Sequence, residues 1–243
     1  MPASLKLQLQ HRVTTYAEPG PRAMRVAAMF GLSLEGDRDE VVVPPTELTL
    51  CPGRVVFVTG VSGGGKSTLL RLVARAIEDM QVRDAAASPD LVRVDQLPAL
   101  PDAALVEALA RPEADEANDK PDASIEQVCG WLSRAGLNDA AVMLRRPGAL
   151  SQGQRDRLKL AQAMAVAERQ ASAWSVLLAD EFGSTLDRTT ARVLARSVGR
   201  WVRSSDTCLV AATAHDDLLE PLAPDVLVEV APGGCCAVYT RPA

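Results

Sequence analysis

The sequence predicts an α/β fold: a mainly parallel core sheet with an N-terminal antiparallel β part and an inserted helical lobe. Apolar runs of strand length alternate with amphipathic helical segments over most of the chain, which is typical of parallel sheets with right-handed crossovers. Between about residues 97 and 148, helical pieces alternate with turns that contain proline. We therefore expect one domain over residues 1–243, with a core lobe at about 1–96 and 149–243 and a helical lobe at about 97–148.

Composition and charge narrow the class of protein. The 243 residues are 47% hydrophobic, which is enough for a large buried core. A net charge of −5 and a pI near 5.2 give no overall attraction to nucleic acid or to anionic lipid. No apolar run approaches the roughly 18 residues of a membrane-spanning helix, and the N-terminal residues lack the apolar stretch of a signal peptide. We expect a cytoplasmic location.

The first half of the chain supplies strands and then a helix. Residues 41–59, "VVVPPTELTLCPGRVVFVT", indicate strands separated by the turn "CPG", and the last of them is apolar enough to be central in a sheet. Residues 67–80, "STLLRLVARAIEDM", have helical periodicity. Within the insertion, Ser124 is followed three residues later by Gln127, so we expect a capping box to start a helix there.

The second half continues the alternation of helices and strands. Residues 155–170 and 188–204 have amphipathic helical patterns. Residues 174–180, "WSVLLAD", and 207–214, "TCLVAATA", are apolar strands. Residues 224–240, "PDVLVEVAPGGCCAVYT", predict a hairpin around the turn "PGG". The chain is therefore expected to end on the sheet.

A glycine-rich motif, "GVSGGGKST", occupies residues 60–68 between a predicted strand and a predicted helix. It satisfies G-x-x-x-x-G-K-[ST], and this context is the one a phosphate-binding loop requires, because backbone N–H groups and the helix N-terminus together form an anion site. Lys66 would place positive charge on the terminal phosphates, and the Ser67 hydroxyl would ligate Mg²⁺. The predicted nucleotide-binding residues of the loop are Ser62, Gly63, Gly64, Gly65, Lys66, Ser67 and Thr68.

Two adjacent carboxylates, Asp180 and Glu181, end one of the buried strands. Asp180 suits the role of an outer Mg²⁺ partner, and Glu181 suits polarising the water that attacks a γ-phosphate. An acidic pair at a strand end is often only a solvated turn. Because the same chain carries a phosphate-binding loop, we interpret the pair as functional.

The order of motifs resembles that of ABC-type ATPases over about residues 47–230. "LSQGQ" (150–154) resembles that family's signature motif, "VLLADE" its Walker B strand, "STLD" (184–187) its D-loop, and His215 its switch histidine. The resemblance implies a P-loop NTPase fold of the ABC ATPase type that binds ATP and Mg²⁺, with His215 contacting the γ-phosphate. It adds these nucleotide-contacting residues: Ser151, Gln152, Gly153, Gln154 and Asp187.

The resemblance also implies a dimer. In that family the signature turn faces ATP held by a second protomer, so that two nucleotides lie between two head-to-tail chains. The chemistry suits this role, because Ser151 as N-cap, the Gly153 N–H and the helix dipole offer partial positive charge to a γ-phosphate. We expect an ATP-dependent dimer of this chain, with a heterodimer as the alternative.

Two more site residues are weaker candidates. Gln96 is the candidate for the family's Q-loop glutamine, which ties Mg²⁺ to the helical lobe, although it follows Lys66 more closely than the resemblance implies. Phe30, in "AMFGLS", is the candidate for the aromatic residue that stacks on adenine; the alternative is a buried apolar residue.

The finer features lead us to expect a soluble machine. Gln152 stands where glycine is commonest in the family, and Phe182 stands where transporter subunits often have proline. The stretches "LSQGQRDRLKLAQA" and "ADEFGSTLDRTTA" resemble poorly characterised soluble ABC ATPases joined to acetyltransferase-like domains. This narrower resemblance implies a separate acetyltransferase-like partner.

The function that we expect is therefore a soluble ABC ATPase that drives conformational change in a macromolecular partner. One alternative is the ATP-binding subunit of an ABC transporter, with a membrane partner. The other is a nucleic-acid maintenance or modification ATPase, which the net charge does not favour.

Overall fold

The computed structural model describes residues 4–15, 20–31, 38–111, 122–170, 172–231 and 235–241. Within these ranges a six-stranded sheet has the order β4-β5-β6-β3-β7-β8, and β1 (Leu5–Thr15) pairs with β2 (Arg38–Leu50) in an antiparallel sheet. All pairs of the larger sheet are parallel except β7 with β8, which confirms the predicted fold class. The strands of the larger sheet are β3 (Val55–Gly60), β4 (Asp90–Arg93), β5 (Ser175–Ala179), β6 (Thr207–Ala212), β7 (Val226–Ala231) and β8 (Cys235–Thr240).

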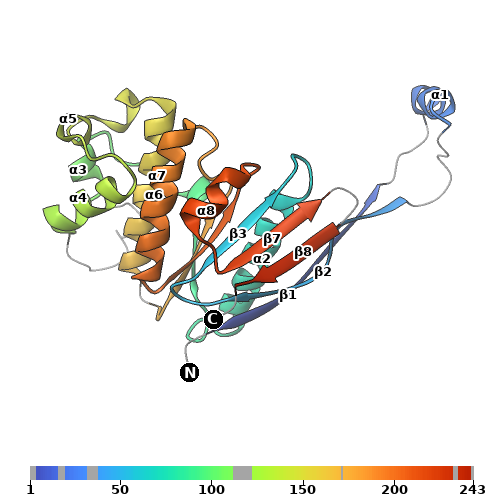
Figure 1. Cartoon of the computed structure of the whole chain (residues 1–243), viewed down its shortest axis with the longest axis horizontal. Coiled ribbons are helices and arrows are strands. Elements are labelled where there is room, and N and C mark those ends of the chain that lie inside the picture. The colour runs from blue at the N-terminus through green and yellow to red at the C-terminus, as the bar shows by residue number, and fades with distance from the viewer. Residues whose placement is uncertain are drawn as a thin grey trace.

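Helices cover both faces of this sheet. Helix α2 (Lys66–Arg83) and the β1–β2 sheet share one hydrophobic cluster with one face. The helices from α3 to α8 gather toward the other face, at the end of the molecule opposite the β1–β2 hairpin (Figure 1). They are α3 (Leu105–Ala108), α4 (Ile125–Arg134), α5 (Ala140–Met143), α6 (Gln152–Arg169), α7 (Arg188–Arg203) and α8 (Leu219–Leu222), with the short 3₁₀ helices η1 (Val94–Gln96), η3 (Pro147–Ala149) and η4 (Asp216–Leu218). None of the helices in the described ranges is both long and apolar enough to cross a membrane.

The alternation of side chains along the strands divides the core in two. In β3, Val55 and Phe57 belong to the cluster under α6 and α7, whereas Val56 and Val58 belong to the cluster under α2. Successive side chains of a strand point to opposite faces of a sheet. The central strands are therefore apolar at nearly every position, as a sheet covered on both faces requires.

Local signals in the sequence are found where they were expected. Ser124 caps α4: its Oγ accepts from the Gln127 N–H at 3.3 Å, and the Gln127 Oε1 accepts from the Ser124 N–H at 2.9 Å. β7 and β8 form the predicted terminal hairpin. Helix α1 (Pro21–Met29), by contrast, is not predicted by the sequence pattern. It lies in the connection between β1 and β2 and stands away from the rest of the molecule (Figure 1).

Glu168, near the end of α6, joins three helices. Its carboxylate accepts from the indole N–H of Trp131 on α4 at 2.7 Å and of Trp201 on α7 at 2.6 Å, and from Arg134 at 3.1 Å. Both indoles are buried, with exposed fractions of 1% and 4%, and a buried indole N–H needs an acceptor. Glu168 therefore joins α4, a helix of the predicted helical lobe, to the layer that covers the core sheet.

Replacing Glu168 by alanine is expected to lower the free energy of unfolding by about 3 kcal/mol, because two buried indole N–H groups lose their acceptor. Unfolding in urea, followed by tryptophan fluorescence, measures the change. Glu168→Gln keeps one carbonyl oxygen at the site and is the matched control; it should lose about half as much. An alanine variant as stable as the wild type would contradict this role.

Candidate nucleotide-binding site

The phosphate-binding loop joins the end of β3 to the start of α2. Gly65 is the N-cap of α2 with φ of 100°, and no side chain of the described residues caps this helix. Its first backbone N–H groups are thus free for an anion, which the helix dipole also favours. A Cβ on Gly60 would lie 1.9 Å from the Val230 carbonyl oxygen. Only glycine therefore allows the loop to pass this close to β7.

The side chain of Lys66 folds back over the phosphate-binding loop. Its Nζ donates to the carbonyl oxygens of Gly60 and Val61, both at 2.8 Å. These bonds hold the ammonium group over the loop, so the positive charge is positioned before a phosphate arrives. A lysine fixed in this way can approach the terminal phosphates of a bound nucleotide.

The acidic pair leaves β5 in an unusual conformation. Glu181 has φ of 51°, the left-handed region that non-glycine residues seldom adopt. Its N–H donates to the Asp180 carboxylate at 3.0 Å, and its carbonyl accepts from the Ser184 N–H at 3.0 Å. The Phe182 N–H fixes the turn to the Ala212 carbonyl of β6 at 2.9 Å. Such strain costs about 1–3 kcal/mol and clusters at functional sites.

One cavity of about 410 Å³ brings these parts together. It collects most of the predicted loop residues, both carboxylates and His215 from the segment after β6. The predicted residues that line it are Ser62, Gly63, Gly65, Lys66, Ser67, Thr68, Asp180, Glu181 and His215. Gly64 is not among its lining residues; the Cβ that Gly64 lacks would lie 3.1 Å from the Val230 carbonyl oxygen.

The cavity also contains residues that were not predicted from the sequence. Arg71 donates to the Ser67 carbonyl and to the Thr68 hydroxyl, both at 3.2 Å. Arg71 follows Ser67 and Thr68 by one helical turn, so its spacing in the sequence could have indicated that it lies beside them. Val42 and Thr213 also line the cavity, but β2 and β6 bring them there from distant parts of the chain, so no local pattern marks them.

The oxygen atoms available in the cavity suit Mg²⁺ that is bound together with a nucleotide. Ser67 and Asp180 line the same cavity and offer a hydroxyl and a carboxylate oxygen. Within the described residues, no group of three or more His, Cys, Asp and Glu side chains is placed to hold a metal ion. Mg²⁺ commonly takes one or two protein oxygens and completes its shell with phosphates and water. These residues therefore fit Mg²⁺ that arrives with its nucleotide.

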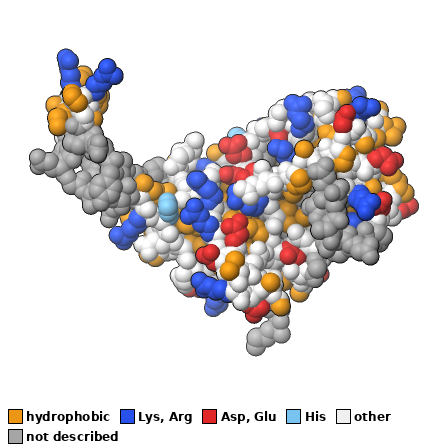
Figure 2. All heavy atoms as spheres, turned by 180° about the vertical axis from the view of Figure 1, so that it is seen from behind, with side chains coloured by type: hydrophobic (Ala, Val, Ile, Leu, Met, Phe, Trp, Pro, Cys, Tyr) orange, Lys and Arg blue, Asp and Glu red, His pale blue; other side chains and the backbone are white. Residues whose placement is uncertain are grey.

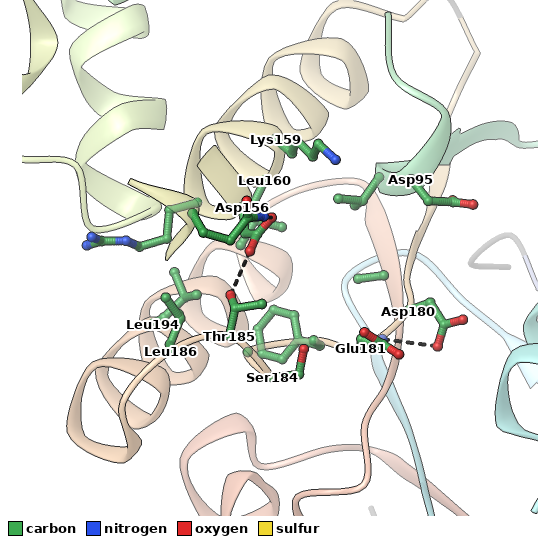
Figure 3. Close-up of a pocket in the computed structure, with 16 residues that line it drawn as sticks. Asp95, Asp156, Lys159, Leu160, Asp180, Glu181, Ser184, Thr185, Leu186 and Leu194 are labelled. Atoms are coloured by element: carbon green, nitrogen blue, oxygen red, sulfur yellow. Dashed lines mark hydrogen bonds between the residues drawn. The ribbon is translucent and has the colours of Figure 1, made fainter. Parts of the chain in front are cut away.

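The predicted signature turn lies at the start of α6. Ser151 is the N-cap: its Oγ accepts from the Gln154 N–H at 3.3 Å, and the Gln154 side chain accepts from the Ser151 N–H at 3.0 Å. None of the described signature residues lines the cavity at the phosphate-binding loop. Gln152 lines a second cavity, of about 270 Å³, between α6 and the segment after β5 (Figure 3). Within one chain, the signature turn is thus separate from the phosphate-binding loop.

Asp187 ends the predicted D-loop and caps α7. Its carboxylate accepts from the Thr190 N–H at 2.9 Å. Hydrogen bonds from the side chain and backbone of Thr190 hold the pKa of this carboxyl below its ordinary value. In this chain alone, Asp187 stabilises a helix terminus and lines neither of the two cavities.

Neither Gln96 nor Phe30 is among the residues that line the nucleotide cavity, and both assignments stay predictions. Gln96, the last residue of η1, lines a different hollow, together with Gln81 of α2. Its neighbour Asp95 faces the cavity of Figure 3 instead. Phe30 follows α1 on the projecting hairpin and is 73% exposed, so it is neither beside the phosphate-binding loop nor buried.

The fold and this site define a P-loop nucleoside triphosphatase. The sequence model of the family described as "ABC transporter" matches residues 43–182. The chain belongs to this ABC family, whose cassettes are ATP-hydrolysing P-loop NTPases.

Individual relatives agree with this assignment. The chain is 30% identical over 188 residues to the putative 2-aminoethylphosphonate import ATP-binding protein PhnT of Salmonella typhimurium, a match that covers 72% of this chain and 48% of PhnT. The chain thus spans about half the length of that relative. It is 29% identical over 213 residues to the lipoprotein-releasing system ATP-binding protein LolD of Granulibacter bethesdensis, covering 81% and 89% of the two chains.

A solved structure has the same fold. The dimeric structure of MJ0796, a bacterial ABC transporter cassette, superposes with a TM-score of 0.66 at 16% identity and covers 98% of this chain and 100% of that chain. At this identity the likeness concerns the fold alone.

Proposed function

We propose that this chain binds and hydrolyses Mg·ATP in a head-to-tail dimer and uses the cycle to change the conformation of a partner protein. The observation that carries the proposal is the single cavity that holds Lys66, the Asp180–Glu181 pair and His215. Phosphoryl transfer requires a cation that binds the phosphates, a carboxylate that holds the metal and a group that orients the attacking water.

Each residue has a role set by its place in the cavity. Lys66 and the first N–H groups of α2 bind the phosphates, and Ser67 and Asp180 would hold Mg²⁺. When bound, Mg²⁺ neutralises charge on the phosphate oxygens. Glu181 accepts a proton from the attacking water, and the rigid turn from β5 fixes its direction. His215, which lines the same cavity, would contact the γ-phosphate.

We propose a dimer because the signature turn lies outside the cavity of its own chain's phosphate-binding loop. Ser151 and the start of α6 lie outside that cavity, and a helix N-terminus favours an anion. A second protomer in head-to-tail orientation would supply ATP to this turn. The MJ0796 cassette, which shares the fold, is dimeric in its solved structure, and this supports the arrangement.

The partner that we propose is an integral membrane subunit of a transporter. PhnT and LolD are ATP-binding proteins of import and lipoprotein-releasing systems, so they favour the transporter alternative over the soluble machine expected from the sequence. Neither name refers to an acetyltransferase-like partner, which stays a prediction. For nucleic acid, the net charge of −5 and the intermixed acidic and basic side chains on the face drawn in Figure 2 offer no support.

Affinity capture from the source cell tests the choice of partner. A tagged Glu181→Gln variant with Mg·ATP, incubated with detergent-solubilised membranes and separately with cytosol, is expected to retain an integral membrane protein from the first. Retention should depend on ATP, so Lys66→Ala serves as the matched control that binds little nucleotide. Capture of cytosolic protein or nucleic acid alone would overturn the transporter assignment.

A further inference from the structure

Gln152 stands where glycine is commonest in the signature motif. Its side chain makes hydrogen bonds in the structure. The Gln152 Nε2 donates to the Asp156 Oδ1 at 3.0 Å. The Thr185 Oγ1 donates to the Asp156 Oδ2 at 2.6 Å (Figure 3). Arg155 donates to the Gln152 Oε1 at 3.3 Å, which leaves the amide nitrogen to face the carboxylate. A glycine could not make this connection. We call it the Gln152–Asp156–Thr185 link.

Direct packing accompanies the link. A Cβ on Gly153 would lie 3.1 Å from the Leu186 Cδ2 and 3.8 Å from the Thr185 carbonyl oxygen. The first turn of α6 and the D-loop are therefore in van der Waals contact. Because both the hydrogen bonds and this contact join the same two segments, a shift of one segment is transmitted to the other.

The D-loop in turn holds the backbone of Glu181. Thr185 directly follows Ser184, whose N–H donates to the Glu181 carbonyl at 3.0 Å. Ser184 and Glu181 line both the phosphate-loop cavity and the cavity beside α6. The segment from Glu181 to Thr185 is thus a short, hydrogen-bonded turn between the nucleotide site and α6.

We propose that the Gln152–Asp156–Thr185 link positions Glu181 according to the state of the signature turn, and so couples the two ATP sites of the dimer. This inference rests on the proposed function, in which the signature turn contacts the partner's ATP while Glu181 acts on the chain's own. The two oxygens of the Asp156 carboxylate accept from both neighbours, and hydrogen bonds to a carboxylate are stronger than those between neutral groups. Thr185 is a positioning residue, because it acts through the turn and not on the nucleotide; Gln152 belongs to the signature turn itself.

Thr185→Val tests the link, since valine keeps the shape of threonine but cannot donate. We expect kcat for ATP hydrolysis to fall about tenfold, the effect of losing one hydrogen bond to a charged group, and the Hill coefficient for ATP to fall toward 1. The affinity of the isolated protomer for ATP, measured at concentrations below dimerisation, should stay within about twofold. Thr185→Ser keeps the donor and should restore both kinetic values.

A second variant distinguishes loss of the link from a general folding defect. Gln152→Met removes the amide at similar length and should lower the Hill coefficient in the same way, with an unchanged melting temperature. Wild-type kcat and Hill coefficient in Thr185→Val, or a loss in Thr185→Ser equal to that in Thr185→Val, would overturn the link while leaving the proposed function intact. Failure of Glu181→Gln to dimerise with Mg·ATP would instead overturn the proposed function.

Discussion

Replacing Glu181 by glutamine is expected to lower the rate of ATP hydrolysis by about 10²- to 10⁴-fold. The amide has nearly the shape of the carboxylate but cannot accept the proton of the attacking water. The left-handed backbone at φ of 51° is as unfavourable for glutamine as for glutamate, so stability should not change. ATP binding should persist, and the ATP-bound dimer should accumulate because its decay requires hydrolysis.

Two measurements check this expectation. Phosphate release gives the rate, and sedimentation with Mg·ATP gives the oligomeric state. Glu229→Gln is the matched control, because Glu229 is an exposed glutamate of β7 outside the nucleotide cavity. Hydrolysis by Glu181→Gln at the wild-type rate would show that another group polarises the water.

Replacing Lys66 by alanine is expected to weaken ATP binding about 100-fold, because the phosphates lose the cation that the loop holds over them. The fold should persist. The Gly60 and Val61 carbonyl oxygens that lose the ammonium donor belong to residues that are partly or largely exposed, so water can replace it.

Calorimetric titration with ATP measures the affinity of the Lys66→Ala variant, and circular dichroism verifies its fold. Lys6→Ala, which removes an exposed lysine on β1, is the control for loss of charge alone. An unchanged dissociation constant in Lys66→Ala would contradict the placement of the phosphates at this loop.

The sequence alone was sufficient for the parts of the molecule that depend on neighbours in the chain. Strand alternation, the capping box at Ser124, the N-cap at Ser151 and the strand–loop–helix context of residues 60–68 are set by contacts within a few residues. The fold class followed from the order of such segments. The phosphate-binding loop and the acidic pair followed from chemistry that requires particular residue types at fixed spacing.

Two residues assigned from the sequence lie outside the nucleotide cavity, and their roles stay predictions. Phe30 was assigned from its residue type, but the connection between β1 and β2 carries it onto the projecting helix α1. Gln96 was assigned from its order in the chain, but its neighbour Asp95 lines the cavity beside α6, whereas Gln96 lines another hollow. A single position does not indicate the direction of a side chain at the end of a short strand.

Thus the sequence by itself determined which local elements form and which residue types are present for phosphate chemistry. Only the tertiary structure decided which of them meet. The order β4-β5-β6-β3-β7-β8 brings the turns after β3, β5 and β6 to one edge, and so places His215 beside Lys66 and Glu181. The Gln152–Asp156–Thr185 link and the contacts of Glu168 with two tryptophans also join distant segments. The reason is physical: such contacts form only after the chain has closed long loops, and the free energy of that closure depends on the packing of the whole core.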